Sequence, residues 1–276
     1  MRSPPTGLMP QLYCWLVALA DSYDGFLIDL DGVVWLGHEP IEGAAKAIAA
    51  LAAAGKPFVF VTNSPRVTPA EQARILREQG IEADEDRVVT AGDTLLELTR
   101  KEIGEAGKVY AIGTSGFLEQ VEGAGFQLLP AERWQEAEAV LVTGHPRFDY
   151  DELKAASMAA RAGAFLATIG RDPTMPMPDG LWPGTGSIVA AVEAASGRTA
   201  VVAGKPERPI FDLGVRRLGL PEGARVAMIG DRLDTDVGGA QKAGLEGILV
   251  AGNESHNPET RVTPNHKISS LLDLTD

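Results

Sequence analysis

The chain has 276 residues, 45% hydrophobic and 23% charged, which predicts a folded protein of two domains or of one large domain carrying an insertion. Its 38 acidic and 25 basic residues give a net charge of −13, which argues against a nucleic-acid-binding or membrane-binding surface. The single cysteine excludes an intramolecular disulfide framework and fits a reducing, cytoplasmic compartment.

The first candidate element is an apolar stretch at residues 12–20, LYCWLVALA. At about nine residues it is too short to cross a bilayer. Its Ala-Leu-Ala ending is similar to a signal-peptidase site, but Pro4, Pro5 and the lone Arg2 weaken that interpretation. We therefore expect a short helix packed on the domain.

Short apolar runs then alternate with amphipathic stretches, which is the pattern of successive strands and helices. Near the N-terminus the expected elements are a strand at 26–30, a helix at 43–55, a strand at 58–62 and a helix at 68–80. Near the C-terminus they are strands at 200–203, 225–229 and 247–250, separated by helices at 208–218 and 235–243. This alternation predicts a doubly wound, Rossmann-like parallel sheet covered by helices on both faces.

The middle of the chain has its own alternation, with strands expected at 109–112, 139–142 and 165–169. We expect an α/β cap domain at 101–197, inserted into a catalytic core formed by 1–100 and 198–276. The segment 171–186, RDPTMPMPDGLWPGTG, is rich in proline and glycine, and we expect it to be an ordered loop without regular structure.

Two aspartates, Asp29 and Asp31, interrupt the first strand at its carboxyl end. Open α/β sheets bind ligands at this edge. A turn-capping role would also explain aspartates in this position.

A second acidic cluster, GDRLDTD at 230–236, directly follows another apolar strand. Its three carboxylates exceed what helix capping requires. If this strand lies beside the first, Asp29, Asp31 and Asp231 converge, and their mutual repulsion calls for a cation. Oxygen ligands favour Mg²⁺ completed by a substrate phosphate.

Two further polar motifs follow predicted strands: Thr62-Asn63-Ser64 and Gly204-Lys205-Pro206. A hydroxyl, an amide and an ammonium group are suitable donors to a phosphoryl group. Each motif alone could be an ordinary turn.

The motifs DLDGV, VTNS, GKP and GDRLDTDV, in this order, resemble those of the haloacid dehalogenase superfamily, and most closely its NagD-like subfamily IIA of magnesium-dependent phosphatases. The segments PGTGSIVAAVEAASGRTAVVAGKP and GDRLDTDVGGAQKAG are similar to those of pyridoxal-phosphate and phosphoglycolate phosphatases. The resemblance covers nearly all of the chain after about residue 24.

The resemblance implies a role for each motif residue. Asp29 would be the nucleophile and Asp31 the general acid and base, while Thr62, Asn63 and Lys205 would bind phosphate. Lys205 would also steady the nucleophile. Magnesium would be held by Asp29, the Asp31 carbonyl and Asp231, with Asp236 supporting these ligands.

The cap holds the candidates for substrate selectivity. Met175 stands where the resembling pyridoxal-phosphate phosphatases have a histidine against the pyridine ring, which disfavours that substrate. His145 could face substrate or be solvated. Arg171 and Asp172 could contribute to selectivity or pair with each other at the hinge. Ser64, followed by Pro65, replaces a second asparagine, so the loop there could contact substrate differently.

The predicted activity is hydrolysis of a small phosphorylated metabolite through an aspartyl-phosphate. Asp31 favours a phosphatase over a dehalogenase, because a halide leaves without needing a proton. A phosphomutase and a non-catalytic receiver-like module remain alternatives. Related enzymes often pair through the cap, so a homodimer is conceivable, and neither a nucleic acid nor a membrane is expected as a partner.

Overall fold

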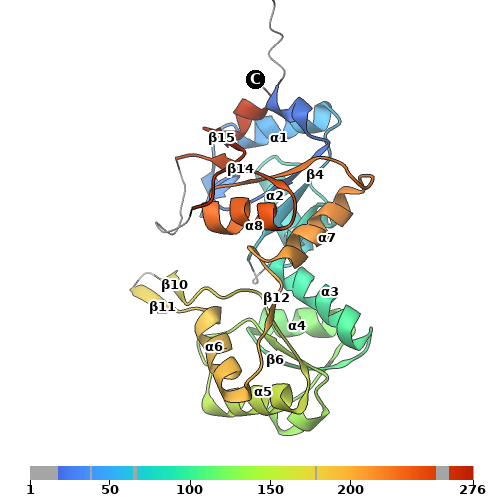
Figure 1. Cartoon of the computed structure of the whole chain (residues 1–276), viewed down its shortest axis with the longest axis vertical. Coiled ribbons are helices and arrows are strands. Elements are labelled where there is room, and N and C mark those ends of the chain that lie inside the picture. Colours follow the sequence, from blue (N-terminus) through green and yellow to red (C-terminus); the bar gives the residue numbers. More distant parts are fainter. Residues whose placement is uncertain (1–17, 38, 65–66, 178, 253–260, 276) are drawn as a thin grey trace, which may run out of the picture.

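The computed structural model describes residues 18–37, 39–64, 67–177, 179–252 and 261–275. Two parallel β-sheets with flanking helices form two lobes, one built from both ends of the chain and one from its middle (Figure 1). The expected α/β architecture, a Rossmann-like core with an inserted α/β cap, is confirmed.

The core sheet has the strand order β15-β14-β13-β1-β4-β5, and all neighbours run parallel. Its strands are β1 (Gly25–Ile28), β4 (Phe58–Thr62), β5 (Val88–Thr90), β13 (Val226–Gly230), β14 (Glu246–Val250) and β15 (His266–Ile268). Its helices are α1 (Ala44–Ala53), α2 (Pro69–Glu78), α3 (Ala91–Ile103), α7 (Arg208–Leu218) and α8 (Gly238–Lys242). A two-stranded flap, β2 (Trp35–Leu36) with β3 (Glu39–Pro40), follows β1.

Alternate side chains of β1 enter opposite halves of the core. Phe26 and Ile28 join the apolar cluster that includes residues of α1 and α2, whereas Leu27 joins the cluster that includes residues of α3 and α7. Because both faces of the strand are covered, all its residues are apolar or glycine, and polar residues begin only where the strand ends.

The cap sheet has the order β12-β9-β8-β6-β7 and is also parallel. Its strands are β6 (Lys108–Ile112), β7 (Gln127–Leu128), β8 (Ala139–Val142), β9 (Phe165–Thr168) and β12 (Val201–Val202), and its helices are α4 (Ser115–Gly123), α5 (Tyr150–Ala162) and α6 (Thr185–Ser196). Residues of α5 and α6 pack on one face, and those of α4 and the core helix α3 pack on the other.

The expected strands and helices of both lobes are present, with ends shifted by a few residues. Thr68 caps α2, because its Oγ1 accepts a hydrogen bond of 3.1 Å from the Glu71 N–H. The helix expected at 235–243 starts instead as a π-helical turn at Leu233–Val237, which continues into α8.

Two expectations were wrong. The strand at Val201–Val202 pairs with β9 in the cap sheet instead of joining the core sheet. The segment expected to lack regular structure contains a β-hairpin, β10 (Thr174–Met177) and β11 (Gly180–Pro183). Backbone pairing between these two strands overrides the local signal of proline and glycine.

The helix expected at 12–20 lies mostly outside the described residues. The described part of that region contains a short 3₁₀-helix, Leu19–Ser22, with Ala20 buried in the core. In the portion of the chain that is described, none of the helices is both long enough and apolar enough to cross a bilayer.

Candidate active site

Three adjacent strands deliver polar side chains to one edge of the core sheet. Asp231 directly follows β13, Asp29 directly follows β1, and Thr62 is the last residue of β4. The order β13-β1-β4 is parallel, so these three carboxyl ends lie side by side. Asp29 and Asp231 therefore converge as expected, but the third carboxylate of the cluster is Asp236 instead of Asp31.

Lys205 reaches this edge from the connection that leaves the cap. Its ammonium lies 2.7 Å from Asp29 Oδ1 and 2.7 Å from Asp236 Oδ1, and it donates a longer bond of 3.4 Å to the Val61 carbonyl. The Lys205 side chain is only 3% exposed. The ammonium is therefore enclosed by two carboxylate oxygens and one carbonyl oxygen.

Burial dominates the electrostatics of this cluster. Burial, with the negative charges of Asp236 and Asp231, raises the pKa of Asp29 to about 8, although Lys205 opposes the shift. Burial alone would lower the pKa of Lys205, but Asp236 and Asp29 together raise it. Burial and Asp236 raise the pKa of Asp231 to about 6.

The three carboxylates Asp29, Asp231 and Asp236 are buried and offer oxygens within 4.8 Å of one another. Lys205 is the cation paired with two of them, so the cluster keeps an excess of negative charge that a divalent ion would neutralise. The Oδ2 atom of Asp236 also accepts the Arg232 N–H at 3.0 Å. The residues thus fit a bound cation, with Asp29 and Asp231 as the more available ligands.

Gly32 lets the two acidic loops approach each other. It adopts a left-handed conformation with φ of +84°, and a Cβ placed there would lie 2.2 Å from Asp231 Oδ2. No larger residue fits without displacing that carboxylate. The close packing of Gly32 against Asp231 therefore explains the glycine of the DLDGV motif.

The side chain of Asp31 is held by the flap. Its Oδ1 accepts a hydrogen bond of 2.9 Å from the indole Nε1–H of Trp35, and the Gly32 N–H donates to the Trp35 carbonyl at 2.7 Å. Trp35 itself is buried, at 5% exposure, whereas Asp31 is exposed to the cavity. Asp31 therefore stands beside the carboxylate cluster instead of inside it.

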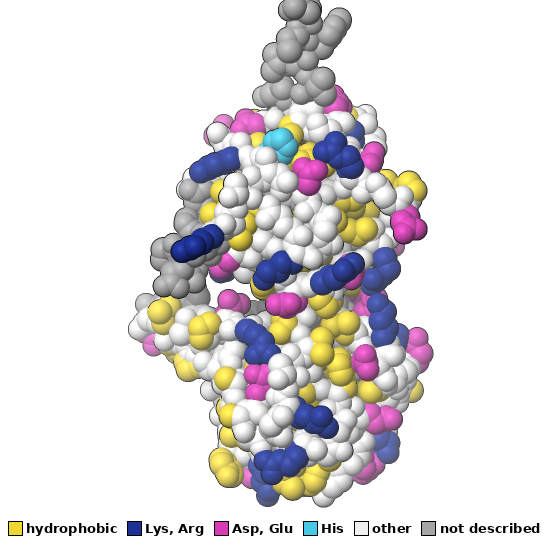
Figure 2. Space-filling view, viewed as in Figure 1, with side chains coloured by type: hydrophobic (Ala, Val, Ile, Leu, Met, Phe, Trp, Pro, Cys, Tyr) yellow, Lys and Arg dark blue, Asp and Glu magenta, His cyan; other side chains and the backbone are white. Residues whose placement is uncertain are grey.

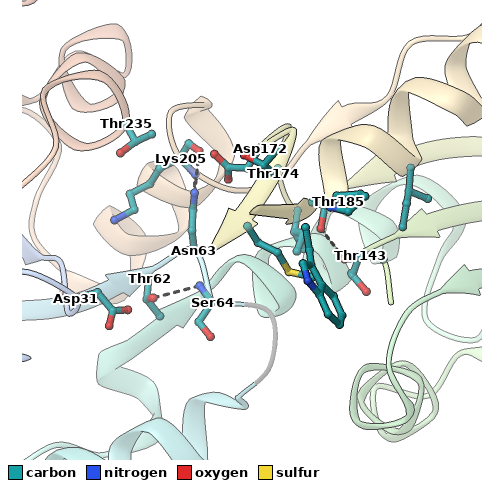
Figure 3. A pocket seen from close by; sticks show the side chains of 18 of the residues that line it. Asp31, Thr62, Asn63, Ser64, Thr143, Asp172, Thr174, Thr185, Lys205 and Thr235 are labelled. Carbon is teal, nitrogen blue, oxygen red and sulfur yellow. Dashed lines mark hydrogen bonds between the residues drawn. The ribbon is translucent and has the colours of Figure 1, made fainter. Parts of the chain in front are cut away.

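At the end of β4 and in the loop after it, Thr62 and Asn63 make different hydrogen bonds (Figure 3). The Thr62 Oγ1 accepts the Ser64 N–H at 3.1 Å, which leaves the Thr62 hydroxyl proton available to a ligand. Asn63 instead exchanges two hydrogen bonds with the backbone of Lys205. Its amide thus supports the lysine loop, a role that the sequence had not suggested.

A cavity of about 820 Å³ lies between core and cap and is lined by these core groups. Cap residues that line it include His145, Phe148, Asp172, Met175, Trp182 and Thr185. Thr185 donates to the Thr143 carbonyl at 2.6 Å, which ties the start of α6 to the loop after β8 (Figure 3). His145, Asp172 and Met175, which the sequence offered as candidates for substrate selectivity, thus line the cavity.

Two cap expectations need revision. Arg171 does not line the cavity and does not pair with Asp172; its guanidinium makes two bonds, of 2.9 and 2.6 Å, to Glu193. His145 is not simply solvated: its Nε2 lies 2.9 Å from Glu152 Oε1, and its Nδ1 accepts the Arg147 N–H at 3.3 Å. The Arg171–Glu193 link joins residues 22 positions apart, whereas the His145 links lie within the loop that leads into α5 and the first turn of that helix.

Two cavity residues, Trp182 and Arg232, and the buried Trp35 that holds Asp31 were missed at the sequence level. Trp35 lies four residues after Asp31, a spacing that could have suggested a contact across a tight turn. Trp182 faces Met175 across the β10-β11 hairpin, which had not been expected. Arg232 sits beside Asp231 in the motif; burial alone would lower its pKa, but Asp234, then Asp172 and Asp236, raise it.

Two family models match the chain, one described as a haloacid dehalogenase-like hydrolase at residues 26–127 and one described as HAD-hydrolase-like at residues 202–274. A D-glycerol 3-phosphate phosphatase from Mycobacterium tuberculosis is 34% identical over 84% of this chain, and the match spans 64% of that protein. The sugar-phosphatase AraL from Bacillus subtilis is 30% identical, with 91% of this chain and 92% of that protein covered.

Solved structures show the same architecture. A glycerol phosphate phosphatase from Mycobacterium tuberculosis, solved in complex with magnesium, superposes with a TM-score of 0.80 at 30% identity and covers 94% of this chain and 78% of that one. A p-nitrophenyl phosphatase from Archaeoglobus fulgidus gives a TM-score of 0.82 at 28% identity, covering 91% and 98%. The similarity extends over core and cap together.

Proposed function

The chain belongs to the haloacid dehalogenase superfamily, in its subfamily IIA of phosphomonoester hydrolases, and we propose that it hydrolyses small phosphorylated metabolites through an aspartyl-phosphate on Asp29. The substrates named for its relatives, glycerol phosphate and sugar phosphates, are of this class. We also propose a role in the reaction for each polar side chain of the site.

The observation that carries the proposal is the position of Lys205 between Asp29 and Asp236, with both Nζ···O distances at 2.7 Å. A carboxylate attacks a phosphate dianion poorly because both are negative. The ammonium offsets this repulsion and fixes the Asp29 carboxylate at the sheet edge. The other Asp29 oxygen is then the one directed to the incoming phosphorus.

A magnesium ion, held by the carboxylates of Asp29 and Asp231 and by the backbone carbonyl of Asp31, would supply further neutralisation of phosphate charge. Asp236 would keep Lys205 and the Arg232 backbone in place instead of binding the ion, since both of its oxygens already have partners. This division of roles follows from the contacts of each carboxylate.

The remaining groups act on the substrate's oxygens. The Thr62 hydroxyl would donate to a phosphate oxygen, while Asn63 would hold the Lys205 loop. Asp31 would protonate the leaving oxygen as the ester bond breaks, and its carboxylate would then take a proton from the water that hydrolyses the aspartyl-phosphate. The cap, which closes one side of the cavity, would exclude bulk water.

The test is to trap the intermediate. With 4-nitrophenyl phosphate and Mg²⁺, the wild-type chain should release phosphate, and quenched reactions with labelled substrate should carry the label on the peptide that contains Asp29. Asp29→Asn should give neither label nor turnover. Label on another residue, or turnover in Asp29→Asn, would refute the assignment. Transfer of the phosphoryl group to a second hydroxyl, without release of phosphate, would indicate a phosphomutase instead.

A further inference from the structure

Two charged side chains of opposite sign line the cavity without a role in the proposed reaction: Arg232 from the core and Asp172 from the cap. His145 uses both of its ring nitrogens in contacts within the cap. The other charged groups of the described lining serve the reaction: Asp29, Asp31, Asp231 and Lys205. Arg232 and Asp172 are therefore the charges that remain for the rest of the substrate.

The guanidinium of Arg232 is available to a ligand. Its Nε lies 3.5 Å from Oδ1 of Asp234, a residue outside the cavity lining. Among the described residues that Nε has no hydrogen-bond partner, no bond is formed by either Nη, and the side chain is 40% exposed. The two Nη atoms at the end of the planar group thus remain for an anion, in the bidentate arrangement that suits a carboxylate.

The carboxylate of Asp172 has neither a hydrogen bond nor an ion pair with any residue that the structure describes, whereas its backbone is fixed. The Asp172 carbonyl accepts the Gly186 N–H at 2.9 Å, at the start of α6. Earlier in the same segment, the Ile169 carbonyl accepts the Gly204 N–H at 3.1 Å, which joins this segment to the connection that carries Lys205. Figure 3 shows Asp172 on the cap side of the cavity that Lys205 lines from the core, so its charge lies near the reacting end.

Arg232 and Asp172, both within the described part of the chain, lie near each other although no ion pair joins them. Burial alone would lower the pKa of Arg232, but the carboxylates of Asp234, Asp172 and Asp236 raise it, which requires Asp172 to be close. On the outer surface, acidic and basic side chains are interspersed and face water, so they need no partner (Figure 2). Inside the cavity charges are less well solvated, so a ligand that pairs with both side chains is favoured.

We propose that this phosphatase acts on an O-phospho-amino acid, a phosphate ester whose alcohol carries a carboxylate for Arg232 and an ammonium for Asp172. Because both charges of an α-amino acid are attached to one carbon, the side chains that bind them must be neighbours. The inference rests on the proposed function, because the same site cleaves the ester: O-phosphoserine and water would give serine and phosphate, with Asp31 protonating the serine oxygen. This class differs from the glycerol and sugar phosphates named for the relatives, whose alcohols are uncharged.

The first experiment compares O-phospho-L-serine with O-phospho-D-serine, two esters of identical intrinsic reactivity, by phosphate release at saturating Mg²⁺. Three contacts, at the phosphate, the carboxylate and the ammonium, fix the substrate in one orientation, so the site must distinguish the enantiomers. We expect their kcat/KM values to differ by about tenfold or more in the wild type, the effect of losing one hydrogen bond between charged groups. In Arg232→Gln and in Asp172→Asn the ratio should fall to within about twofold, because two contacts no longer fix the orientation.

The second experiment assigns each charge with three further esters: phosphoethanolamine has only the ammonium, 3-(phosphonooxy)propanoate has only the carboxylate, and propyl phosphate has neither. Arg232→Gln should lower kcat/KM by about tenfold for the two carboxylate esters, phosphoserine included. Asp172→Asn should lower it by about fivefold for the two ammonium esters, the effect of one unit charge at about 4 Å in a water-like medium. Propyl phosphate should change by less than about twofold, and the losses should lie mainly in KM, because both contacts precede the reaction.

The matched controls are Arg74→Gln and Asp212→Asn, which remove the same charges from exposed ion pairs outside the cavity lining and should leave every ratio unchanged. Equal kcat/KM for the two enantiomers in the wild type would overturn the proposal. So would an equal loss with all esters in Arg232→Gln and Asp172→Asn, since that result would give the pair a structural role only. Phosphate release from 4-nitrophenyl phosphate but not from phosphoserine overturns this proposal alone, whereas release from neither ester contradicts the proposed function.

Discussion

Asn63 and Lys205, 142 positions apart in the chain, are joined by two reciprocal hydrogen bonds: the Asn63 amide donates to the Lys205 carbonyl at 2.9 Å and accepts the Lys205 N–H at 2.7 Å. The pair links the end of β4 to the connection that leaves the cap. Because Lys205 carries the ammonium that pairs with Asp29, the asparagine sets the position of the principal cation in the site.

Asn63→Ala should therefore impair catalysis through Lys205. We expect kcat to fall by about tenfold to a hundredfold, the loss expected when a reacting group moves by about 1 Å, and stability to fall by about 1–3 kcal/mol for the unsatisfied backbone groups. The matched control is Asn265→Ala, since the Asn265 Oδ1 accepts bonds from Gly247 N–H and Gln241 Nε2–H far from the cavity. It should lose stability but keep kcat. Equal kcat in both variants would contradict the positioning role.

The metal site predicts a thermal response that does not depend on turnover. Mg²⁺ should raise the midpoint of thermal unfolding of the wild type, by an amount that corresponds to about 2.7 kcal/mol when the ion is present at about 100 times its Kd. Asp231→Asn should lose most of this shift, whereas Asp234→Asn, which lies outside the carboxylate cluster, should retain it. Chelation should abolish phosphate release. A full shift in Asp231→Asn would show that the ion binds elsewhere.

The two tasks assigned to Asp31 can be separated by leaving group. A 4-nitrophenolate ion is weakly basic and needs little protonation, whereas the alkoxide from glycerol phosphate needs much. In Asp31→Asn the nitrophenyl ester should give a burst of no more than about one equivalent per site, with a later phase slowed by about 10²–10⁴. The alkyl ester should give no burst. A steady rate without trapped phosphoenzyme would remove Asp31 from the second step.

The hydrogen bond from Trp35 to Asp31 predicts that changing Trp35 slows the alkyl ester more than the nitrophenyl ester, as in Asp31→Asn but to a smaller extent. Trp35→Phe keeps an aromatic ring in the buried flap but removes the N–H that holds the Asp31 carboxylate. Hydrolysis of the alkyl ester should slow by about tenfold, while burst formation from the nitrophenyl ester should change by less than about twofold. Trp35→Tyr, with a donor, is the conservative comparison. An equal loss with both esters would indicate that Trp35 only supports the fold.

Glu246, which does not line the cavity, should make the stability of the fold depend on pH. Hydrogen bonds from Tyr23 at 2.7 Å and from Arg225 at 3.0 Å lower the pKa of Glu246. A lowered folded-state pKa adds stability above the unfolded value of about 4.3, and this stability is lost as the pH falls through the folded value.

Glu246→Gln should therefore destabilise the protein at pH 7 by a few tenths to about 1 kcal/mol, because the group is partly solvated. The difference from wild type should diminish below about pH 4. Urea unfolding at both pH values measures it. Glu82→Gln, at an exposed position in the turn after α2 without a described ion pair, serves as the control. A difference that persists unchanged into acid would exclude the ionised carboxylate as its source.

The sequence by itself determined most of the alternation of strands and helices and the four polar motifs. Strands covered on both faces must be continuously apolar, so the polar residues at 29–31, 62–64 and 230–236 marked the strand ends to within about two residues. Helix limits were equally visible where local chemistry sets them, as at Thr68, which caps α2. Strand ends and helix caps depend on residues that are adjacent in the chain, so they can be predicted from the sequence.

Only the tertiary structure decided which sheet received β12, that 174–183 forms a hairpin, and which partners each polar group found. The contacts of Asn63 with Lys205 and of Arg171 with Glu193 have a geometry that the spacing of residues does not encode. Hydrogen bonds and ion pairs depend on distances of about 3 Å and on direction. Those distances are set by packing between segments far apart in the chain, and so they appear only once the chain has folded.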